Sequence, residues 1–166
     1  MYQIGEIVAY GIDGVCRIEE IAQRKFRDEF ITYYVLKPIY KSTSTVFVPQ
    51  NSEKLLAKLR PVLTAEQVDA VIDAMPGASP IWKENENERK LLYKDVLSSG
   101  VSLDIVGMMK ALFAHQENQR AKGKKLHMTD EHYLKEGERI LFDEFSVALS
   151  IAPGEVREYI EKRLAE

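Results

Sequence analysis

The spacing of apolar residues changes near residue 50, and this change constrains the fold more than any other feature of the chain. Before it, short runs rich in β-branched and aromatic residues alternate with clusters of glycine, aspartate and serine, which is typical of short β-strands joined by turns. After it, apolar residues recur three or four positions apart, as in amphipathic helices. The sequence therefore predicts an α+β protein, in which a small antiparallel β module (residues 1–52) precedes an all-α bundle of about five helices (residues 53–166).

The first region contains four strand-like runs. Strands are predicted at Gly5–Tyr10, Val15–Ile21, Phe30–Leu36 and Thr45–Pro49. Turn-forming residues separate them at Gly11–Gly14 and Lys41–Ser44, and a polar tip at Arg24–Glu29 lies between the second and third runs. Strands this short, joined by tight turns, favour a strongly bent antiparallel sheet or a small barrel.

Several helix boundaries can be predicted in the second region. Thr64 and Gln67 have the spacing of a capping box, in which each side chain binds the backbone amide of the other residue. Further helices are predicted at about 84–98, after Ser102 as a cap residue, and from Thr129 and Pro153. The first of these is expected to end at Gly100. Gly137 lies on the apolar face of a predicted helix, where it costs about 1 kcal/mol relative to alanine, so we expect a neighbouring helix backbone to approach closely there.

Composition and motifs argue against several classes of function. The single cysteine, Cys16, cannot form a disulfide framework or a clustered-thiol metal site, and no apolar run is long enough to span a membrane. The chain has no glycine-rich phosphate loop, and the helical spacing of His127 and His132 would not bring both onto one metal. The opening residues do not have the pattern of a signal peptide. We therefore expect a cytoplasmic protein with no catalytic residue, no metal, no cofactor, no small-molecule substrate and no membrane contact.

The net charge of −3 argues against strong sequence-independent binding of nucleic acid, so any such contact must depend on local clusters. One cluster surrounds the only tryptophan, Trp82, which follows a linker and precedes Lys83, Arg89 and Lys90. Two interpretations stay open. Trp82 either belongs to the core, as most tryptophans do, or it inserts at a base step of DNA or stacks on an unpaired base.

Two further basic clusters also have a structural and a functional interpretation. Lys122, Lys124 and Lys125 lie in the connection between the two longest predicted helices, where lysines either contact phosphates or form an ordinary solvated loop. In the polar tip of the first region, Phe26 lies close to Arg24. Exposed aromatic residues beside arginines favour protein interfaces.

Taken together, these features resemble the CarD/CdnL family of bacterial transcription regulators. The resemblance extends over nearly the whole chain in the family's order. It is carried by Ile4–Tyr10 with Gly14, Tyr33–Lys37, Val46–Pro49, Leu59–Val62, Trp82 with Arg89, Leu97–Gly100 and Arg139–Phe145. The resemblance implies that the first region is a Tudor-like domain, similar to that of transcription-repair coupling factor, which docks on the β subunit of bacterial RNA polymerase.

The resemblance implies a set of polymerase contacts in the first region. Arg24 matches a family arginine that faces the polymerase. The short strand of Val46, Phe47 and Val48 would pair with a polymerase strand, because backbone hydrogen bonds give affinity without much side-chain specificity. Phe47 stands where some relatives carry a second arginine, so an ion pair at that position is replaced by an apolar contact.

The resemblance also implies contacts with promoter DNA. Trp82 occupies the position of a family tryptophan that wedges into the minor groove at the upstream edge of the melted region, and Arg89 matches a basic residue beside it. Such a wedge hinders reannealing and stabilises the open complex. The predicted contacts also include Lys83, Lys90, Lys122, Lys124 and Lys125. The segment after Trp82 carries three more acids than in some relatives, so we expect weak DNA affinity that depends on tethering to polymerase.

The sequence thus predicts a non-enzymatic transcription regulator that bridges RNA polymerase and promoter DNA and alters the lifetime of the open complex, acting at the nucleoid through the polymerase. One alternative is a polymerase-tethered adaptor whose helical region recruits another protein without direct DNA contact. A second alternative is an RNA-binding module, since small bent barrels also bind RNA.

Overall fold

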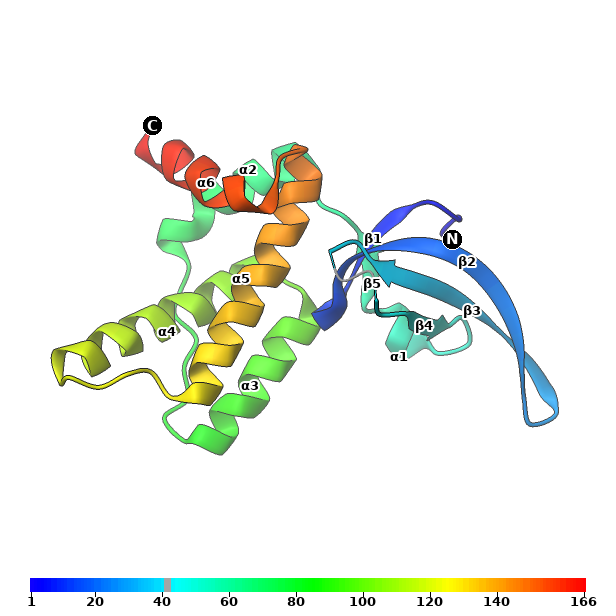
Figure 1. Cartoon of the computed structure of the whole chain (residues 1–166), viewed down its shortest axis with the longest axis horizontal. Coiled ribbons are helices and arrows are strands. Elements are labelled where there is room, and N and C mark those ends of the chain that lie inside the picture. The colour runs from blue at the N-terminus through cyan, green and yellow to red at the C-terminus, as the bar shows by residue number, and fades with distance from the viewer. Residues whose placement is uncertain (41–42) are drawn as a thin grey trace. The chain divides into compact units, whose positions relative to one another are not determined.

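The chain divides into two compact units, Met1–Val62 and Leu63–Glu166 (Figure 1). The computed structural model describes residues 1–40 and 43–166. The division falls at Val62 and not at residue 52, because Leu59–Pro61 forms a strand of the first unit. The turn predicted at Lys41–Ser44 lies partly outside the described residues, which do not include 41 and 42.

Among the described residues, the first unit forms a five-stranded antiparallel sheet with the strand order β4-β3-β2-β1-β5. Its strands are β1 (Ile7–Tyr10), β2 (Gly14–Phe26), β3 (Glu29–Pro38), β4 (Val46–Pro49) and β5 (Leu59–Pro61). A 3-10 turn, Gly11–Asp13, joins β1 to β2, and a short helix, α1 (Glu53–Leu56), precedes β5. This sheet and the helices that follow confirm the predicted α+β class, and the sheet is consistent with a Tudor-like module.

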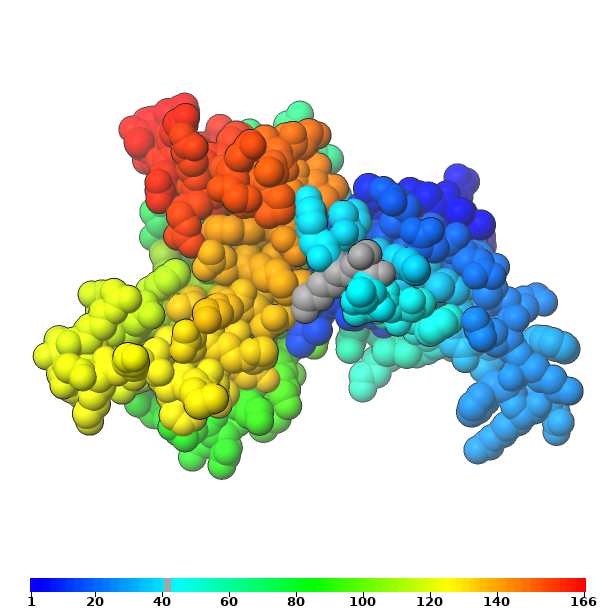
Figure 2. Space-filling view, in the orientation of Figure 1, coloured from blue at the N-terminus to red at the C-terminus, as the bar shows by residue number. Residues whose placement is uncertain are grey.

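The hairpin of β2 and β3 is longer than the predicted strands and includes most of the polar tip. Its last pair is Phe26 with Glu29, so the turn consists of Arg27 and Asp28. Arg27 has a φ of 58°. Cross-strand pairs stabilise polar residues that have little β propensity of their own, which is why the apolar runs predict strands that are too short. Figure 2 shows the end of this hairpin as a narrow projection, coloured blue.

The core of the first unit lies on one face of its sheet, because successive side chains of a strand point to opposite faces. The buried side chains of this core are Val8, Tyr10, Cys16, Ile18, Tyr34, Leu36, Val48 and Leu59. A register shift between Ile18 and Glu20 interrupts the pairing of β2 with β3. Irregularities of this kind bend a strand, which agrees with the predicted bend of the sheet.

The second unit, all of whose residues are described, contains five α-helices, in agreement with the prediction. They are α2 (Ala65–Ala74), α3 (Glu86–Ser99), α4 (Ser102–Ala121), α5 (Met128–Leu149) and α6 (Val156–Ala165). Two 3-10 turns, Met75–Gly77 and Pro153–Glu155, follow α2 and precede α6. α5 contacts each of the other four helices and is the centre of the unit (Figure 1). The largest side chains buried there are Tyr93, Phe145, Ile72, Leu97, Ile105, Met108 and Leu112.

The predicted helix ends are confirmed at two positions and wrong at two others. Thr64 and Gln67 form the capping box, with N–O distances of 2.9 and 3.1 Å, and Gly100 ends α3 in the left-handed conformation at φ 66°. Ser102 does not cap α4, because the helix already begins after Val101, whose carbonyl accepts from Ile105. α5 begins before Thr129, because His127 is its cap residue.

Gly137 has the close neighbours that its place in a helix predicts. A Cβ atom there would lie 3.0 Å from Cε of Met108 and 3.5 Å from side-chain atoms of Ile105 and Met109. These contacts come from side chains of α4, where the sequence predicted a backbone. The absence of a side chain at Gly137 therefore lets α4 and α5 pack closely in the centre of the unit.

Candidate functional site

Trp82 lies on the segment that joins the 3-10 turn after α2 to the start of α3. Its side chain is half-buried and packs against the core of the helical unit. Cζ of Arg89 lies over the indole at 4.5 Å from the ring centroid, and the ring of His115 lies 4.8 Å from it, centroid to centroid. The indole N–H donates to Oε1 of Glu84 at 3.2 Å. The side chain therefore contacts the core and still reaches the surface, which is compatible with both interpretations of Trp82.

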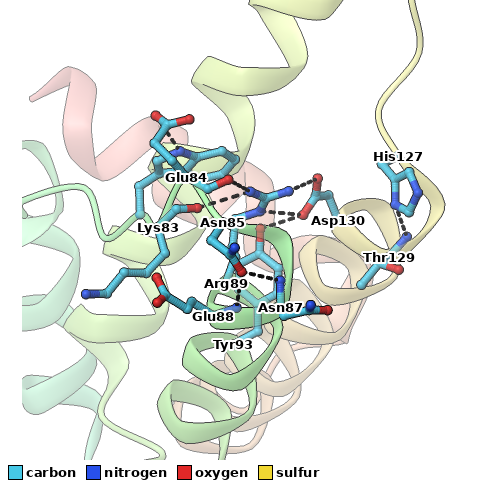
Figure 3. A network of polar contacts seen from close by, with 11 residues as sticks. Lys83, Glu84, Asn85, Asn87, Glu88, Arg89, Tyr93, His127, Thr129 and Asp130 are labelled. Carbon is cyan, nitrogen blue, oxygen red and sulfur yellow. Dashed lines mark hydrogen bonds and ion pairs between the residues drawn. The ribbon is translucent and has the colours of Figure 1, made fainter.

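Arg89 is buried, and its guanidinium connects three parts of the unit (Figure 3). Its Nε and Nη2 atoms donate to the two carboxylate oxygens of Asp130 on α5, at 3.1 and 3.2 Å. Its Nη1 atom donates to the carbonyl oxygens of Lys83 and Glu84, at 3.0 and 3.1 Å. Tyr93 completes the network, because its hydroxyl donates to Oδ1 of Asp130 at 2.7 Å. Arg89, predicted to contact DNA directly, thus fixes the backbone that follows Trp82.

Burial and hydrogen bonding set the charges of this network. Burial by itself would lower the pKa of Arg89, but the hydrogen bond and the charge of Asp130 outweigh this and raise it. The pKa of Tyr93 is raised strongly, first by burial and then by its hydrogen bond to Asp130 and the charge of that carboxylate. Arg89 therefore stays protonated, and Tyr93 keeps its proton and donates a hydrogen bond.

α4 holds the segment that leads to Trp82. Ile81 N–H donates to the carbonyl of Gly107 at 3.1 Å, and Nζ of Lys110 donates to the carbonyls of Pro76 and Ala78, both at 2.9 Å. A Cβ atom at Gly107 would overlap the carbonyl oxygen of Ser79. The segment therefore lies directly on the backbone of α4, at a position where only glycine leaves room for it.

The indole borders a pocket of about 340 Å³ that also receives residues from α4 and from the connection between α4 and α5. Besides Trp82, the pocket is lined by Glu84, Glu86, Arg89, His115, Gln119, Lys125, His127 and Asp130. The structure therefore brings Lys125 to the same pocket as Trp82, although 43 positions separate them. The connection that carries Lys125 forms one end of the helical unit, coloured yellow in Figure 2.

The other four predicted lysines are exposed but do not line this pocket. Lys90 lines a neighbouring pocket with Arg89 and Asp130. Lys124 lines another with Lys125 and Arg120. Lys83 and Lys122 are exposed but line none of these three pockets, and Figure 3 shows the side chain of Lys83 extending away from Asp130. The structure thus brings one of the five lysines to the Trp82 pocket, places Lys90 and Lys124 in two other pockets, and leaves Lys83 and Lys122 outside all three.

Acidic side chains lie at the same place. Glu84 and Glu86 line the Trp82 pocket, and Glu86 and Glu88 belong to the first turn of α3, which Asn85 caps by accepting from two backbone amides. Acids stabilise the positive end of a helix. They also lower the local positive potential, which agrees with the expectation of weak DNA affinity.

Sequence reasoning did not find the roles of Asp130 and His115. Asp130 lies 41 positions from the arginine it binds. His115 lies 33 positions from the tryptophan whose ring it contacts. Neither residue has a local motif, so only the packing of α3, α4 and α5 identifies them.

The first unit presents a different candidate contact, at the edge of its sheet. β4 is an edge strand, and Gln50 N–H donates to the carbonyl of Thr32 on β3 at 2.8 Å. Because hydrogen-bonded and non-bonded pairs alternate in an antiparallel ladder, Val46 and Val48 face β3 with their backbone groups. The N–H and C=O groups of Phe47 therefore point to the open edge.

The side chains at this edge are arranged around Phe47, which is 43% exposed. Cζ of Arg24 lies 5.1 Å from the centroid of the Phe47 ring, and Tyr33 contacts the same ring edge to face at 6.3 Å. Val48 is fully buried, and Val46 is half-buried. Of the three strand residues predicted to contact the polymerase, Phe47 alone has an exposed side chain, and the structure places Arg24 beside it.

The first unit is similar in sequence to a known family of domains, because residues 2–63 match the family model described as the CarD-like/TRCF RID domain. Over its whole length the chain is similar to a Bacillus subtilis (strain 168) protein named "Putative transcription factor YdeB", with 25% identity over 166 residues, 96% of this chain and 99% of that protein. These findings confirm the resemblance that the sequence predicted.

Two further observations concern the described residues alone. Within 1–40 and 43–166, no three histidine, cysteine, aspartate or glutamate side chains are grouped so that they could hold a metal ion. Over the same ranges, no helix combines the length and the apolar character that crossing a membrane requires.

Proposed function

We propose that this protein is a non-enzymatic transcription regulator that binds the β subunit of bacterial RNA polymerase through its first unit and contacts promoter DNA through Trp82, at the upstream edge of the bubble. The family model that the first unit matches and the name of the full-length relative support a role in transcription. The observation that carries the DNA contact is the half-buried Trp82, fixed over the buried pair of Arg89 and Asp130 in one pocket with Lys125.

The polymerase contact is proposed at the open edge of β4. A partner strand pairs there with the N–H and C=O groups of Phe47, and such strand addition supplies affinity through the backbone. Arg24 and Phe47 add side-chain contacts because they are exposed next to each other. Val46 and Val48 hold the strand in place, since their backbone groups face β3.

The proposed DNA contact has two parts, one made by Trp82 and one made by the basic residues near it. Trp82 fills a distorted base step and hinders reannealing. Phosphates are contacted by five lysines, namely Lys83, Lys90, Lys122, Lys124 and Lys125. Arg89 positions the indole of Trp82. Tethering to polymerase raises the effective concentration of the helical unit at the promoter to about the millimolar range, so that weak contacts are sufficient.

The test is the replacement Trp82→Ala, measured as the lifetime of the promoter open complex and as binding to polymerase. We expect the effect on open-complex lifetime to disappear while polymerase binding stays unchanged. Phe113→Ala is the control, because Phe113 is also an exposed aromatic residue of the helical unit. An unchanged open-complex lifetime in Trp82→Ala would refute the wedge and favour the adaptor that recruits another protein.

A further inference from the structure

We infer that His115 is a positioning residue for Trp82, which holds the indole in the orientation from which it enters DNA. The inference rests on the proposed function of Trp82 and extends it to a residue on another helix. His115 lies on α4, 33 positions after Trp82, and its ring lies 4.8 Å from the indole with an interplanar angle of 39°. This is the separation of a close ring contact.

The other contacts of the indole leave its orientation incompletely fixed. Arg89 is rigid, because Asp130 and two carbonyl oxygens hold its guanidinium. It provides one fixed surface for the ring. The bond from the indole N–H to Glu84 is exposed to solvent, and exposed polar bonds of this kind contribute little. His115 adds to the packing of Trp82 on the core a ring contact from α4, which restricts rotation of the Trp82 side chain further.

The position of His115 on α4 suits this role. The same helix holds the segment before Trp82 at Gly107 and Lys110, and His115 lies one to two turns further along it. α4 thus aligns both the backbone that leads to the tryptophan and its ring. Because His115 is itself only half-buried, its replacement leaves the core of the unit largely intact.

Fixing the ring before binding has a measurable benefit. Ordering one flexible side chain on association costs about 0.5–1.5 kcal/mol, which is a factor of about two to ten in an equilibrium constant. A tryptophan already held by His115 does not incur this cost when it enters the base step. Loss of the ring at position 115 should therefore weaken the effect on the open complex by about two- to tenfold.

The experiment compares His115→Ala with His115→Phe in the full chain. Trp82 is the only tryptophan, so intrinsic fluorescence reports on this side chain alone. We expect His115→Ala to increase quenching of Trp82 by acrylamide, to lower its fluorescence anisotropy and to shorten the open-complex lifetime. The Phe variant restores all three signals, because it keeps a ring at the contact. His132→Ala is the control, since the ring contact of His132 is with Tyr133.

The outcomes separate this inference from the proposed function. If Trp82→Ala removes the promoter effect while His115→Ala changes neither the fluorescence nor the open-complex lifetime, the inference is wrong and the wedge stands. If Trp82→Ala has no promoter effect, the wedge is wrong, and the fluorescence of His115→Ala still decides whether position 115 fixes the ring. A loss in His115→Ala that His115→Phe does not restore would also overturn the inference.

Discussion

Arg89 and Asp130 are 41 positions apart in the sequence, yet they form a buried two-point ion pair beneath Trp82. The side chains are 7% and 2% exposed, so neither charge is solvated by bulk water. Each of the two Arg–Asp hydrogen bonds joins α3 to α5, and the remaining Arg89 nitrogen holds the backbone just after Trp82. The stability of the helical unit and the placement of the tryptophan therefore depend on the same two residues.

Replacement of Asp130 by alanine should destabilise the helical unit by about 3–5 kcal/mol, because it leaves the charge of Arg89 buried without a partner. Urea unfolding followed by Trp82 fluorescence measures this loss. Glu131→Ala is the matched control, since Glu131 is an exposed neighbour paired with Lys135 on the surface, and it should cost about 0.5 kcal/mol or less. A loss below about 1 kcal/mol in Asp130→Ala would contradict the assigned role of the pair.

The stability contributed by the Tyr93 hydroxyl should decrease in alkali. In the folded chain the pKa of Tyr93 is raised above its ordinary value of 10.0 by burial and by Asp130. The unfolded chain then releases this proton near pH 10 while the folded chain retains it, so raising the pH above 10 favours unfolding. The difference in unfolding free energy between the wild type and Tyr93→Phe should shrink between pH 9 and pH 11. A constant difference over that interval would contradict this prediction.

Replacement of Gly107 by alanine should displace the segment that leads to Trp82. The new methyl group would overlap the carbonyl oxygen of Ser79 and lie 3.2 Å from a side-chain atom of Ile81. Overpacking of this kind costs about 1–3 kcal/mol, and the emission of Trp82 should change with it. Gly77→Ala is the control, because a Cβ there meets nothing within 4 Å. Equal stability and emission in the two variants would show that the segment does not depend on Gly107.

Reversal of charge at Arg24 should weaken binding to polymerase without unfolding the first unit. Arg24 is exposed and lies against the Phe47 ring at the open edge of β4. Arginine is enriched among the minority of interface residues whose loss costs more than about 1 kcal/mol, so Arg24→Glu should raise the dissociation constant at least about fivefold. Arg17→Glu makes the same charge change elsewhere on β2 and serves as the comparison. Identical affinities of the two variants for polymerase would exclude the edge of β4 as the polymerase contact.

Among the basic residues, Lys125 should matter more to the promoter effect than Lys122, because only Lys125 lines the pocket of Trp82. Open-complex lifetimes of Lys125→Gln and Lys122→Gln, measured over a series of salt concentrations, test this difference. Each lost phosphate contact should reduce the logarithmic salt slope by about one. An unchanged salt slope in Lys125→Gln would show that Lys125 does not contact a phosphate.

The sequence predicts those features that depend on near neighbours. The capping box of Thr64 and Gln67 needs two residues three positions apart, and the end of α3 at Gly100 needs one glycine. β5 was not predicted, because Leu59–Pro61 is short and contains a proline, which rarely occurs within strands. It forms through pairing with β1, which lies some 50 positions earlier.

In the candidate site, too, the sequence predicts what depends on near neighbours and does not predict what depends on distant residues. Trp82 and the lysines can be selected from the sequence, because an isolated aromatic residue beside cations has a recognisable chemistry. The buried state of Arg89 cannot be predicted that way, since an arginine in the first turns of a helix is usually solvated. It is buried because the packing of α5 on α3 brings Asp130 to it, while Tyr93, one turn further along α3, binds the same carboxylate.

The edge of β4 also bears on self-association. An open strand edge can pair with the same edge of another copy and start aggregation. Here the outward-facing backbone groups belong to Phe47 and Pro49, and proline has no N–H to donate. Two such edges could therefore exchange very few hydrogen bonds. The strand is a poor template for copies of itself, and the strand addition proposed above depends on the side chains of Arg24 and Phe47 as well as on the backbone.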